Sequence, residues 1–331
     1  MAVTMRDVAA HAGVSQRTVS NVVTGAVPVR PETRARVEAS IAALGYRTFG
    51  PARQLRQGRT STVTLALPGL TEPYFAELAQ CVVDRAREHG LRVVVVTTRG
   101  DRAEELAILR GDQVFADGVI MSAVGLAPED ETLPHPSLPT VLIGDRGAGA
   151  DVAHVTPDNR AACRDAVRHL VALGRRRVAL VGAGTGPPLT CQERTAGYRD
   201  ALAEAGLPLD PALLVPCAWN FDAGRQAVAE ALERVPDVDA VFAMNDSSAL
   251  GALQALVRAG RRVPDDVAVA GFDNMREGAH ATPGLTSVGP LPDEVAAAAL
   301  GELRRQLAGE PPRRHQLPHR LVERGSTSGV G

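Results

Sequence analysis

Hydrophobic positions repeat with two different periods along this chain. Between residues 4 and 45, apolar side chains recur every three or four positions, which is the spacing of short helices that each bury one face. After residue 61, short β-branched runs alternate with longer amphipathic stretches. The change of period predicts a small all-helical domain followed by a larger α/β domain.

The first two predicted helices are short and are joined by a tight turn. Thr4 is placed to cap the first helix, Gly13 to end it, and Ser15 to cap the second. The second helix carries three valines at i, i+3 and i+4 spacing, so polar side chains occupy its opposite face. That outward face is predicted to carry Gln16, Arg17, Ser20 and Asn21. Such short or planar hydrogen-bonding groups suit the edges of base pairs in the DNA major groove.

A third helix is predicted from Pro31, which suits a first helical position, to Gly45, which suits a helix end. Its buried stripe is predicted to be Val37, Ile41 and Leu44. Two short helices joined by a glycine-containing turn predict a helix-turn-helix that reads DNA. The alternative interpretation is a three-helix bundle that only packs against, or binds, protein.

Basic side chains are distributed unevenly along the chain. Residues 1–60 hold nine arginines and three acidic residues, whereas the rest of the chain holds 27 basic and 35 acidic residues. The chain contains no lysine, so every basic contact comes from arginine, whose planar fork binds phosphate or guanine through two hydrogen bonds. A basic first domain before an acidic body indicates a polyanionic partner for the first domain alone.

Residues 47–60 are predicted to form a linker with a short helix that Gly50 and Pro51 open and Gly58 closes. Leu55 stands there among arginines and has no core of its own. It is predicted either to insert between base steps in the DNA minor groove or to pack on a neighbouring domain, and spacing alone favours neither.

Three runs in residues 1–60 stand out as motifs: MRDVAAHAGVSQRTVSNVVTG, VRPETRARVEASIAALGYR and ARQLRQGRT. Together they resemble the DNA-binding head and hinge of the lac-repressor (LacI/GalR) family. The resemblance implies that Gln16, Arg17 and Asn21 read bases, that Leu55 is a minor-groove wedge, and that a symmetric dimer binds a pseudo-palindromic operator. The full set of expected DNA contacts is Thr4, Ser15, Gln16, Arg17, Thr18, Ser20, Asn21, Arg53, Leu55 and Arg56.

Beyond residue 61, the candidate strands are short apolar runs: Val63–Leu67, Arg92–Thr97, Gly118–Ser122, Thr140–Ile143, Val178–Val181, Ala240–Ala243 and Val267–Ala270. The candidate helices lie between and after them: Phe75–Glu88, Arg102–Arg110, Arg160–Leu173, Glu193–Ala205, Ala223–Glu233, Ser247–Arg258 and Pro292–Leu307. This alternation predicts parallel sheets that are covered on both faces, and the chain is long enough for two of them.

Ligands of such sheets bind outside the carboxyl ends of the strands, so the residues that follow strands are the candidate binding residues. They offer aromatic rings, carboxylates, a guanidinium and an amide: Tyr74, Phe75, Ser122, Asp145, Arg194, Trp219, Asn245 and Asp273. This mixture suits a polyhydroxylated ligand such as a sugar, whose ring stacks on an aromatic side chain. Asp246 is expected only to cap the helix that follows it.

Several runs of the body, among them LTEPYFAEL, DGVIMSA, ERTAGYRDAL, AMNDSSALGAL and VAVAGFDN, resemble the sensor domain of the same family, which is itself similar to periplasmic sugar-binding proteins. The resemblance implies that Arg194, Asn245 and Asp273 contact the effector and that Trp219 lines the pocket. The expected fold is an all-α helix-turn-helix head plus an α/β body of two doubly wound parallel-sheet subdomains. The expected boundaries are 1–46 for the head, 47–60 for the hinge and 61–331 for the effector-binding and dimerisation domain, in which one subdomain holds about 61–157 and 289–318 and the other about 158–288 and 319–331.

Other classes of protein have weaker support. Gly182, Gly184 and Gly186 follow a predicted strand, but their GxGxG spacing is not the GxGxxG of a dinucleotide-binding enzyme. The four cysteines are far apart and show no metal-ligand spacing, so we expect no metal, no cofactor and no disulfide framework.

A transport receptor would fit the body alone, but the start of the chain lacks an apolar signal-peptide core. The longest strongly apolar run, near Val93–Val96, is too short to span a bilayer, so we expect a cytoplasmic protein without a membrane partner.

We therefore expect a sequence-specific transcriptional regulator, a repressor rather than an enzyme. It is expected to bind its operator as a homodimer and to be released by a carbohydrate effector. Two alternatives stay open: an effector that acts with the opposite sign, as a corepressor, and a regulator that activates rather than represses. The tail RLVERGSTSG has no heptad extension, so a tetramerising coiled coil is not expected.

Overall fold

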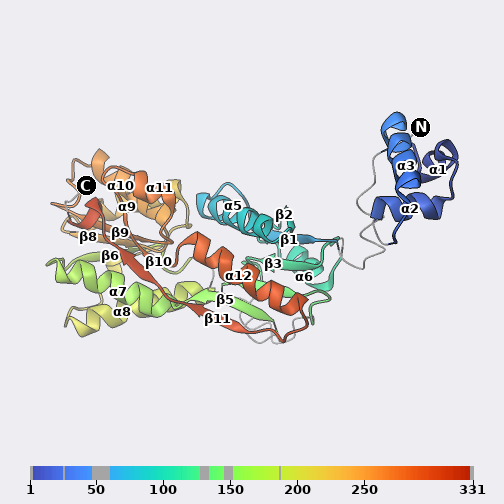
Figure 1. The fold of residues 1–331 in the computed structure, drawn as a ribbon. Coiled ribbons are helices and arrows are strands. Elements are labelled where there is room, and N and C mark those ends of the chain that lie inside the picture. The colour runs from blue at the N-terminus through green and yellow to red at the C-terminus, as the bar shows by residue number, and fades with distance from the viewer. Residues whose placement is uncertain are drawn as a thin grey trace. The chain divides into compact units, whose positions relative to one another are not determined.

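The chain divides into two compact units, Met1–Ser61 and Thr62–Gly331. The first unit is all helical, and the second unit alternates strands and helices, as the two hydrophobic periods predicted (Figure 1). The computed structural model describes residues 3–24, 27–46, 60–112, 114–126, 134–144, 152–185 and 188–328.

Three helices form the described part of the first unit: α1 (Met5–Ala12), α2 (Gln16–Thr24) and α3 (Pro31–Leu44). Val8, Val19 and Val37, one from each helix, are fully buried and belong to one small apolar cluster. The helical spacing of the valines therefore produces the core that it predicted.

Hydrogen-bonded caps define the turn between α1 and α2. Thr4 Oγ1 accepts from the Asp7 amide at 3.4 Å, while the Asp7 carboxylate accepts from the Thr4 amide at 2.8 Å, so a reciprocal capping box begins α1. Gly13 ends α1 with a left-handed φ of 63°, which glycine adopts without strain. Ser15 Oγ accepts from the Thr18 amide at 3.1 Å and caps α2, as predicted.

Ser20 does not lie on the outward face of α2, so that part of the prediction is wrong. Only 4% of Ser20 is exposed, whereas Gln16 and Arg17 are exposed and Asn21 is half-buried. The reason is that α2 packs against both α1 and α3, so its buried arc is wider than the valine stripe. Ser20, which follows the buried Val19, is small enough to be enclosed at that contact.

The third helix also begins and ends where the sequence predicted. Pro31 occupies its first position, and Gly45 ends it with a left-handed φ of 62°. Arg30 precedes the helix but its side chain makes no capping hydrogen bond. Ser40 is buried, donates to the main chain of α3 at 2.8 Å and lies 3.0 Å from His11 Nδ1, which ties α3 to α1.

The described part of the second unit contains two six-stranded sheets, in the orders β11-β5-β4-β3-β1-β2 and β12-β10-β9-β8-β6-β7. All neighbouring strands are parallel except β10 and β12. The strands of the first sheet are β1 (Thr62–Leu67), β2 (Arg92–Thr97), β3 (Gly118–Met121), β4 (Thr140–Ile143), β5 (Ala153–Pro157) and β11 (Arg314–Leu317). Those of the second sheet are β6 (Val178–Val181), β7 (Leu214–Val215), β8 (Ala240–Ala243), β9 (Ala268–Phe272), β10 (Thr286–Gly289) and β12 (Arg320–Val322).

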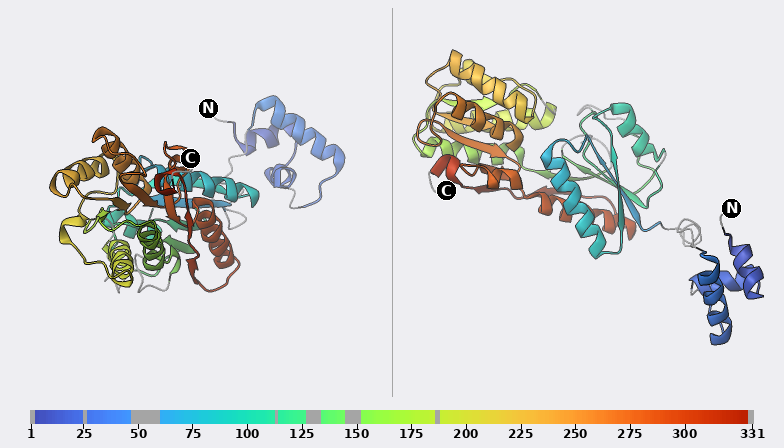
Figure 2. Two further views of the ribbon diagram at one scale, coloured as in Figure 1. Left: turned by 90° about the vertical axis from the view of Figure 1, so that its left-hand side faces the viewer. Right: turned by 90° about the horizontal axis from the view of Figure 1, so that it is seen from above.

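Helices cover both faces of each sheet (Figure 2). The helices of this unit are α5 (Pro73–Glu88), α6 (Arg102–Arg110), α7 (Asn159–Ala172), α8 (Pro188–Glu204), α9 (Phe221–Arg234), α10 (Asp246–Arg258), α11 (Arg276–His280), α12 (Pro292–Leu307) and α13 (Gly325–Ser328), with a short 3-10 turn at Pro211–Leu213. The first sheet packs α5 and α12 on one face and α6 on the other. The second packs α7 and α8 on one face and α9 and α10 on the other. This is the doubly wound α/β architecture that the sequence predicted.

The chain passes between the two sheets three times: from β5 to α7, from β10 to α12, and from β11 to β12. The first sheet and its helices therefore come from residues 62–157 and 292–317, and the second from residues 159–289 and 320–328. Because β11 joins the first sheet and β12 joins the second, segments far apart in the sequence lie side by side in the first sheet, and the two sheets are linked by three crossings of the chain.

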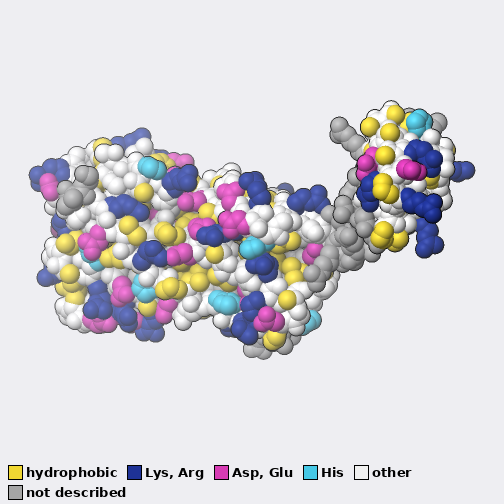
Figure 3. All heavy atoms as spheres, in the orientation of Figure 1, with side chains coloured by type: hydrophobic (Ala, Val, Ile, Leu, Met, Phe, Trp, Pro, Cys, Tyr) yellow, Lys and Arg dark blue, Asp and Glu magenta, His cyan; other side chains and the backbone are white. Residues whose placement is uncertain are grey.

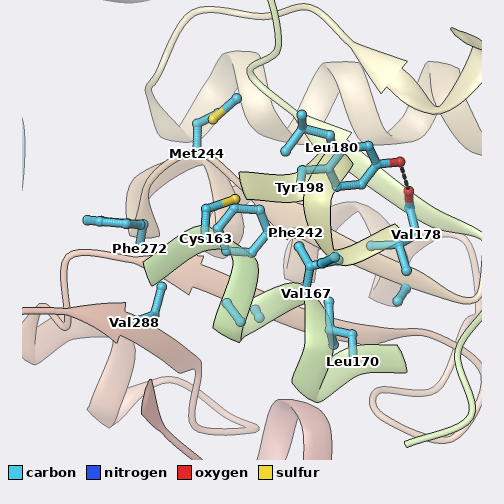
Figure 4. Packing of buried hydrophobic residues seen from close by; sticks show 14 of the residues in the cluster. Cys163, Val167, Leu170, Val178, Leu180, Tyr198, Phe242, Met244, Phe272 and Val288 are labelled. Carbon is cyan, nitrogen blue, oxygen red and sulfur yellow. Dashed lines mark hydrogen bonds between the residues drawn. The ribbon is translucent and has the colours of Figure 1, made fainter. Parts of the chain in front are cut away.

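The core of the second sheet illustrates how the apolar runs are used (Figure 4). Phe242 of β8 and Tyr198 of α8 are fully buried beside aliphatic residues of α7. The Tyr198 hydroxyl donates to the Val178 carbonyl at 2.8 Å, which satisfies its one polar atom inside the core.

All seven predicted strands are present, with ends that differ by at most two residues. The helix predicted from Glu193 begins earlier, at Pro188. Five strands were not predicted: β5, β7, β10, β11 and β12. They are short or carry polar residues: His154 and Pro157 interrupt the apolar run of β5, and β11 reads RHQL, so no hydrophobic period marks them.

Candidate functional site

The first unit exposes basic and polar side chains (Figure 3). Gln16 and Arg17 are exposed in the first turn of α2, and Arg6, Arg30 and Arg36 are exposed on or beside α1 and α3. Exposed arginines on a small helical unit suit a phosphate backbone, and a planar side chain at the start of α2 suits a base edge.

The predicted hydroxyl contacts of this unit are engaged in caps. Thr4 Oγ1 donates to Asp7 at 2.7 Å, and the Ser15 and Thr18 hydroxyls lie 2.9 Å apart. These hydroxyls fix the ends of α1 and α2 and so orient the exposed side chains. The predicted hinge contacts, Arg53, Leu55 and Arg56, lie outside the residues that the structure describes.

A cavity of about 440 Å³ opens between the two sheets of the second unit. Many of its lining residues follow the carboxyl ends of parallel strands, among them Ser122 after β3, Asn245 after β8 and Pro290 after β10. Seven of the eight predicted effector contacts line it: Tyr74, Phe75, Ser122, Arg194, Trp219, Asn245 and Asp273. The eighth, Asp145, lies outside the described residues.

Arg194 is the most constrained of the charged residues in the cavity wall. It is 6% exposed, its Nε donates to Asn159 Oδ1 at 2.9 Å, and its Nη1 donates to the Met244 carbonyl. Its guanidinium carbon lies 3.3 Å from the ring centre of Phe272 and 5.3 Å from that of Trp219. Stacking and hydrogen bonds together hold a buried positive charge in one orientation.

Asp273 provides the opposing negative charge. Its Oδ1 lies 4.0 Å from Arg194 Nη2, and its backbone has a left-handed φ of 117°. Burial raises the pKa of Asp273 to about 7, although the charge of Arg194 and a hydrogen bond from the Asp246 amide both lower it. A carboxylate that water solvates poorly binds ligand hydroxyl groups strongly.

Asn245 and Trp219 support each other on the second sheet. Asn245 Nδ2 donates to the Trp219 carbonyl at 3.0 Å, and the indole of Trp219 donates to the Gly182 carbonyl at 3.0 Å. Asn245 Oδ1 accepts from the Ser248 amide at 3.0 Å, so Asn245 caps α10. The expectation that Asp246 caps this helix is therefore wrong: Asp246 is the first residue inside α10 and is completely buried.

Two aromatic residues of α5, which covers the first sheet, also line the cavity. Tyr74 and Phe75 begin α5, and their ring centres lie 5.4 Å apart in an edge-to-face arrangement. Burial, followed by the charge of Asp273, raises the pKa of Tyr74 above its usual range. The hydroxyl of Tyr74 therefore stays protonated and can donate a hydrogen bond to a ligand.

The sequence did not single out four further lining residues that bear functional groups or pack on them: Glu72, Asn159, Thr190 and Phe272. Asn159 follows β5, whose polar sequence hid the strand, and Phe272 is the last residue of β9 rather than a residue after it. Within the described ranges, no group of three His, Cys, Asp or Glu residues is placed to hold a metal ion. No helix there is long and apolar enough to cross a membrane.

Comparison with known proteins relates both units to one family. The family described as "Bacterial regulatory proteins, lacI family" matches residues 4–48, and "Periplasmic binding proteins and sugar binding domain of LacI family" matches residues 60–307. Catabolite control protein A of Priestia megaterium is 34% identical over 333 residues, which cover 99% of this chain and 100% of the relative.

Solved structures give the same relationship. A complex of the transcriptional regulator CelR with cellobiose has a TM-score of 0.71 and 33% identity, over 98% of this chain and 99% of that one. The lac repressor dimer bound to operator and the anti-inducer ONPF has a TM-score of 0.84 and 26% identity over 100% of both chains. The chain therefore belongs to the lacI family of bacterial regulatory proteins, and it is a DNA-binding transcriptional regulator with a sugar-sensor type of body.

Proposed function

We propose that this protein is a repressor that binds a pseudo-palindromic operator as a homodimer and is released by a carbohydrate effector. The observation that carries the proposal is the cavity between the two sheets, where a carboxylate, a guanidinium, a tyrosine hydroxyl and an indole surround one space. The cellobiose complex of CelR and the operator-bound dimer of the lac repressor support it. No catalytic step is proposed, and the DNA partner favours a cytoplasmic location.

The proposed effector is a neutral carbohydrate. The cavity volume of about 440 Å³ lies within the range of small-molecule sites, and Trp219 and Tyr74 offer rings on which a sugar face stacks. Asp273 accepts hydroxyl hydrogen bonds, and when it is ionised Arg194 balances its charge at 4.0 Å, so the ionised pair has no net charge to offer an ionic ligand.

The proposed assignment of domains follows the expected boundaries. Residues 1–46 form the head, 47–60 the hinge, and 61–331 the effector-binding and dimerisation domain, with subdomains at about 61–157 with 289–318 and 158–288 with 319–331. Arg53, Leu55 and Arg56 are proposed to act in the hinge, with Leu55 between base steps of the minor groove. A chain that begins at residue 61 should bind effector but not operator DNA.

The proposed mechanism is a coupled equilibrium. Effector bound between the sheets favours one arrangement of the two subdomains, and the separation of the two hinges in the dimer follows that arrangement. The free energy available equals the difference in effector affinity between the two arrangements. A corepressor would favour the DNA-binding arrangement, so effector added to a preformed operator complex would tighten it rather than release it.

A dimer surface is proposed on the body. β2 is an edge strand of the first sheet, and Val94 on it is 49% exposed. Phe115, before β3, is 90% exposed, which is unusual for a phenylalanine. Val94→Asp should weaken dimerisation in analytical ultracentrifugation, whereas Val257→Asp, on the similarly exposed outer face of α10, is the matched comparison.

The proposed base-reading residues are Gln16, Arg17 and Asn21. Thr4, Ser15 and Thr18 are proposed to lie near the DNA backbone. Ser20 is proposed only as a packing residue. Arg17→Ala should lose about 1–3 kcal/mol at one base position of the operator. Arg36→Ala, an exposed arginine of α3, should weaken binding equally on all sequences or not at all. An equal loss for Arg17→Ala on random DNA would leave it only a phosphate contact.

The decisive experiment uses Trp219, the single tryptophan of the chain, which lines the cavity. Intrinsic fluorescence is titrated with pentoses, hexoses, disaccharides, polyols and purines. A saturable change with one sugar, lost in Asp273→Ala, would establish the effector class and the site together. Silence across the panel would contradict the carbohydrate assignment.

A further inference from the structure

A buried carboxylate behind the cavity wall carries an inference beyond the proposed function. Asp246 is the first residue of α10 and has an exposed fraction of 0%. Asn245 already caps α10, so capping does not account for Asp246. A fully buried carboxylate is strongly unfavourable unless polar groups bind it, so its partners indicate its role.

Two hydrogen bonds hold the carboxylate of Asp246. Ser287 Oγ donates to Oδ1 at 2.6 Å, and the Met275 amide donates to Oδ2 at 2.9 Å. Ser287 Oγ also accepts from the Asn274 amide at 3.0 Å, so the proton of its hydroxyl points to Asp246. One carboxylate thus fixes two successive amides of the segment that follows β9, one directly and one through a serine.

The backbone of β9 is shaped to admit this carboxylate. A Cβ on Gly271 would lie 2.2 Å from Asp246 Oδ1, so the carboxylate lies against bare main chain. Asp246 therefore connects the start of α10 to β9, to Ser287 of β10 and to the segment that precedes α11.

The segment that Asp246 fixes is strained. Asp273 has a φ of 117° and Asn274 a φ of 53°, both in the region that favours glycine. Non-glycine residues persist there only when their surroundings hold them. The Asn274 side chain supplies part of this restraint, since its Nδ2 donates to the Gly289 carbonyl at 2.9 Å and to the Arg320 carbonyl at 3.2 Å. The Asp273 amide, which donates to the Val288 carbonyl at 2.9 Å, and the two amides held by Asp246 supply further restraint.

We propose that Asp246 is a positioning residue of the effector site. Its carboxylate holds residues 273–275 on the left-handed path that turns the Asp273 carboxylate into the cavity, and Asp246 itself does not touch the effector. The functional meaning of this role rests on the proposed part of Asp273 in effector binding.

The charge of Asp273 also acts on the carboxyl group of Asp246. Burial, followed by the charge of Asp273, raises the pKa of Asp246 well above its usual range, against the hydrogen bonds from Ser287 and Met275. Arg324 also faces Asp246. Around Asp273, the facing groups are Arg194 of α8 and Tyr74 of α5. Since burial is what raises the pKa of Asp273, a change that releases residues 273–275 from the Asp246 carboxylate should lower that pKa.

The first test measures amide hydrogen exchange in the full-length protein without effector. Asp246→Ala and Ser287→Ala should each speed exchange of the segment containing Asn274 and Met275 by about tenfold or more. The matched control is Asp239→Ala. Asp239, at the other end of β8, accepts from the amides of Arg176 and Arg177, both at 2.8 Å, so its loss should leave exchange at 274–275 unchanged.

The second test follows carboxyl titrations by NMR with 13C-labelled aspartate. The signal of Asp273 is assigned by its loss in Asp273→Asn, and its midpoint should lie near its pKa of about 7. Asp246→Asn keeps the shape but leaves one acceptor oxygen for the Met275 amide and the Ser287 hydroxyl, so Asp273 should lose its buried position and that midpoint should fall. In Asp239→Asn it should not move.

Unchanged exchange in Ser287→Ala together with an unmoved Asp273 midpoint in Asp246→Asn would overturn the proposal. Faster exchange at 274–275 in Asp239→Ala, equal to that in Ser287→Ala, would overturn it as well, because general destabilisation would then explain both. If Asp246→Ala does not fold, the other two variants decide the outcome. Neither readout needs an effector, so a silent sugar panel contradicts the proposed function without affecting this test.

Discussion

The guanidinium carbon of Arg194 lies 3.3 Å from the ring centre of Phe272, so a buried cation is stacked on an apolar ring where the cavity meets the core of the second sheet. Both residues are less than one-tenth exposed. The guanidinium lies over the ring of Phe272, and its hydrogen bonds to Asn159 and to the Met244 carbonyl fix its orientation.

Arg194→Lys should therefore behave as a disruptive change although it keeps the charge. An ammonium group cannot stack on Phe272 and donate to both oxygens, so the free energy of unfolding should fall by roughly 1–3 kcal/mol. Urea unfolding measures it. Arg168→Lys, at an exposed arginine of α7, is the control and should stay within about 0.5 kcal/mol. If Arg194→Lys lowers the free energy of unfolding no more than Arg168→Lys does, the stack of Arg194 on Phe272 contributes nothing to stability.

The raised pKa of Asp273, about 7, makes an unusual prediction about stability. Between the usual pKa of an aspartate and 7, the folded state holds a proton that the unfolded state has released, so stability falls as the pH rises through this range. Asp273→Asn removes this effect. At about pH 8 the variant should have a higher melting temperature than the parent, and its free energy of unfolding should be larger by on the order of 1 kcal/mol or more. This gain should vanish at about pH 4.

The same Asp273→Asn variant should respond poorly to effector, since an amide accepts fewer hydrogen bonds than a carboxylate. If Asp273→Asn makes the protein more stable and at the same time weakens its response to effector, Asp273 is a residue retained for function at a cost in stability. A melting temperature at pH 8 equal to that of the parent would contradict the raised pKa.

Glu302 on α12 should be important for the stability of the first sheet. Its side chain is 0% exposed and accepts from His315 Nε2 at 2.8 Å, from Arg305 Nη1 at 2.6 Å and from the Arg313 amide at 3.0 Å. Glu302→Gln removes the charge that these donors share and should lower the free energy of unfolding by about 3 kcal/mol. Glu310→Gln, which removes a half-exposed partner of Arg305, is the comparison and should have a small effect.

Glu302 also predicts a dependence on pH. Burial alone would raise the pKa of Glu302, but the hydrogen bonds from His315, Arg305 and the Arg313 amide outweigh it, so the pKa lies below the usual range. Its contribution is therefore present above the usual pKa of a glutamate and is lost as the pH falls through the lower, folded-state pKa. Melting curves of the parent and of Glu302→Gln should converge in acid, and parallel curves would argue against this role.

The start of α3 offers a stabilising change in the first unit. Arg30 precedes the helix without a capping hydrogen bond, so Arg30→Ser should supply one to the first turn and stabilise α3 by about 1 kcal/mol. Amide exchange in the first turn of α3 should slow. Arg36→Ser, the same replacement within the helix, should not slow it, because a serine there has no free amide to cap.

The sequence alone determined the elements that local physics dictates. Valines at helical spacing, capping hydroxyls and glycines at helix ends defined α1 to α3, and continuous β-branched runs such as Val178–Val181 defined the central strands. Parallel strands present their carboxyl ends to a common edge. The sequence therefore also predicted most of the polar side chains of the cavity wall, Arg194 and Asp273 among them.

Tertiary structure decided what depends on neighbours distant in the sequence. Ser20 is buried because α2 contacts two helices at once, and β11 forms only because β5 offers it a free edge to pair with. Asp246 was expected to cap its helix, but its carboxylate binds Met275 and Ser287, 29 and 41 residues away along the chain. A periodic pattern encodes which face of an element is apolar, whereas the partner of a buried polar group is set only when separate elements close around it.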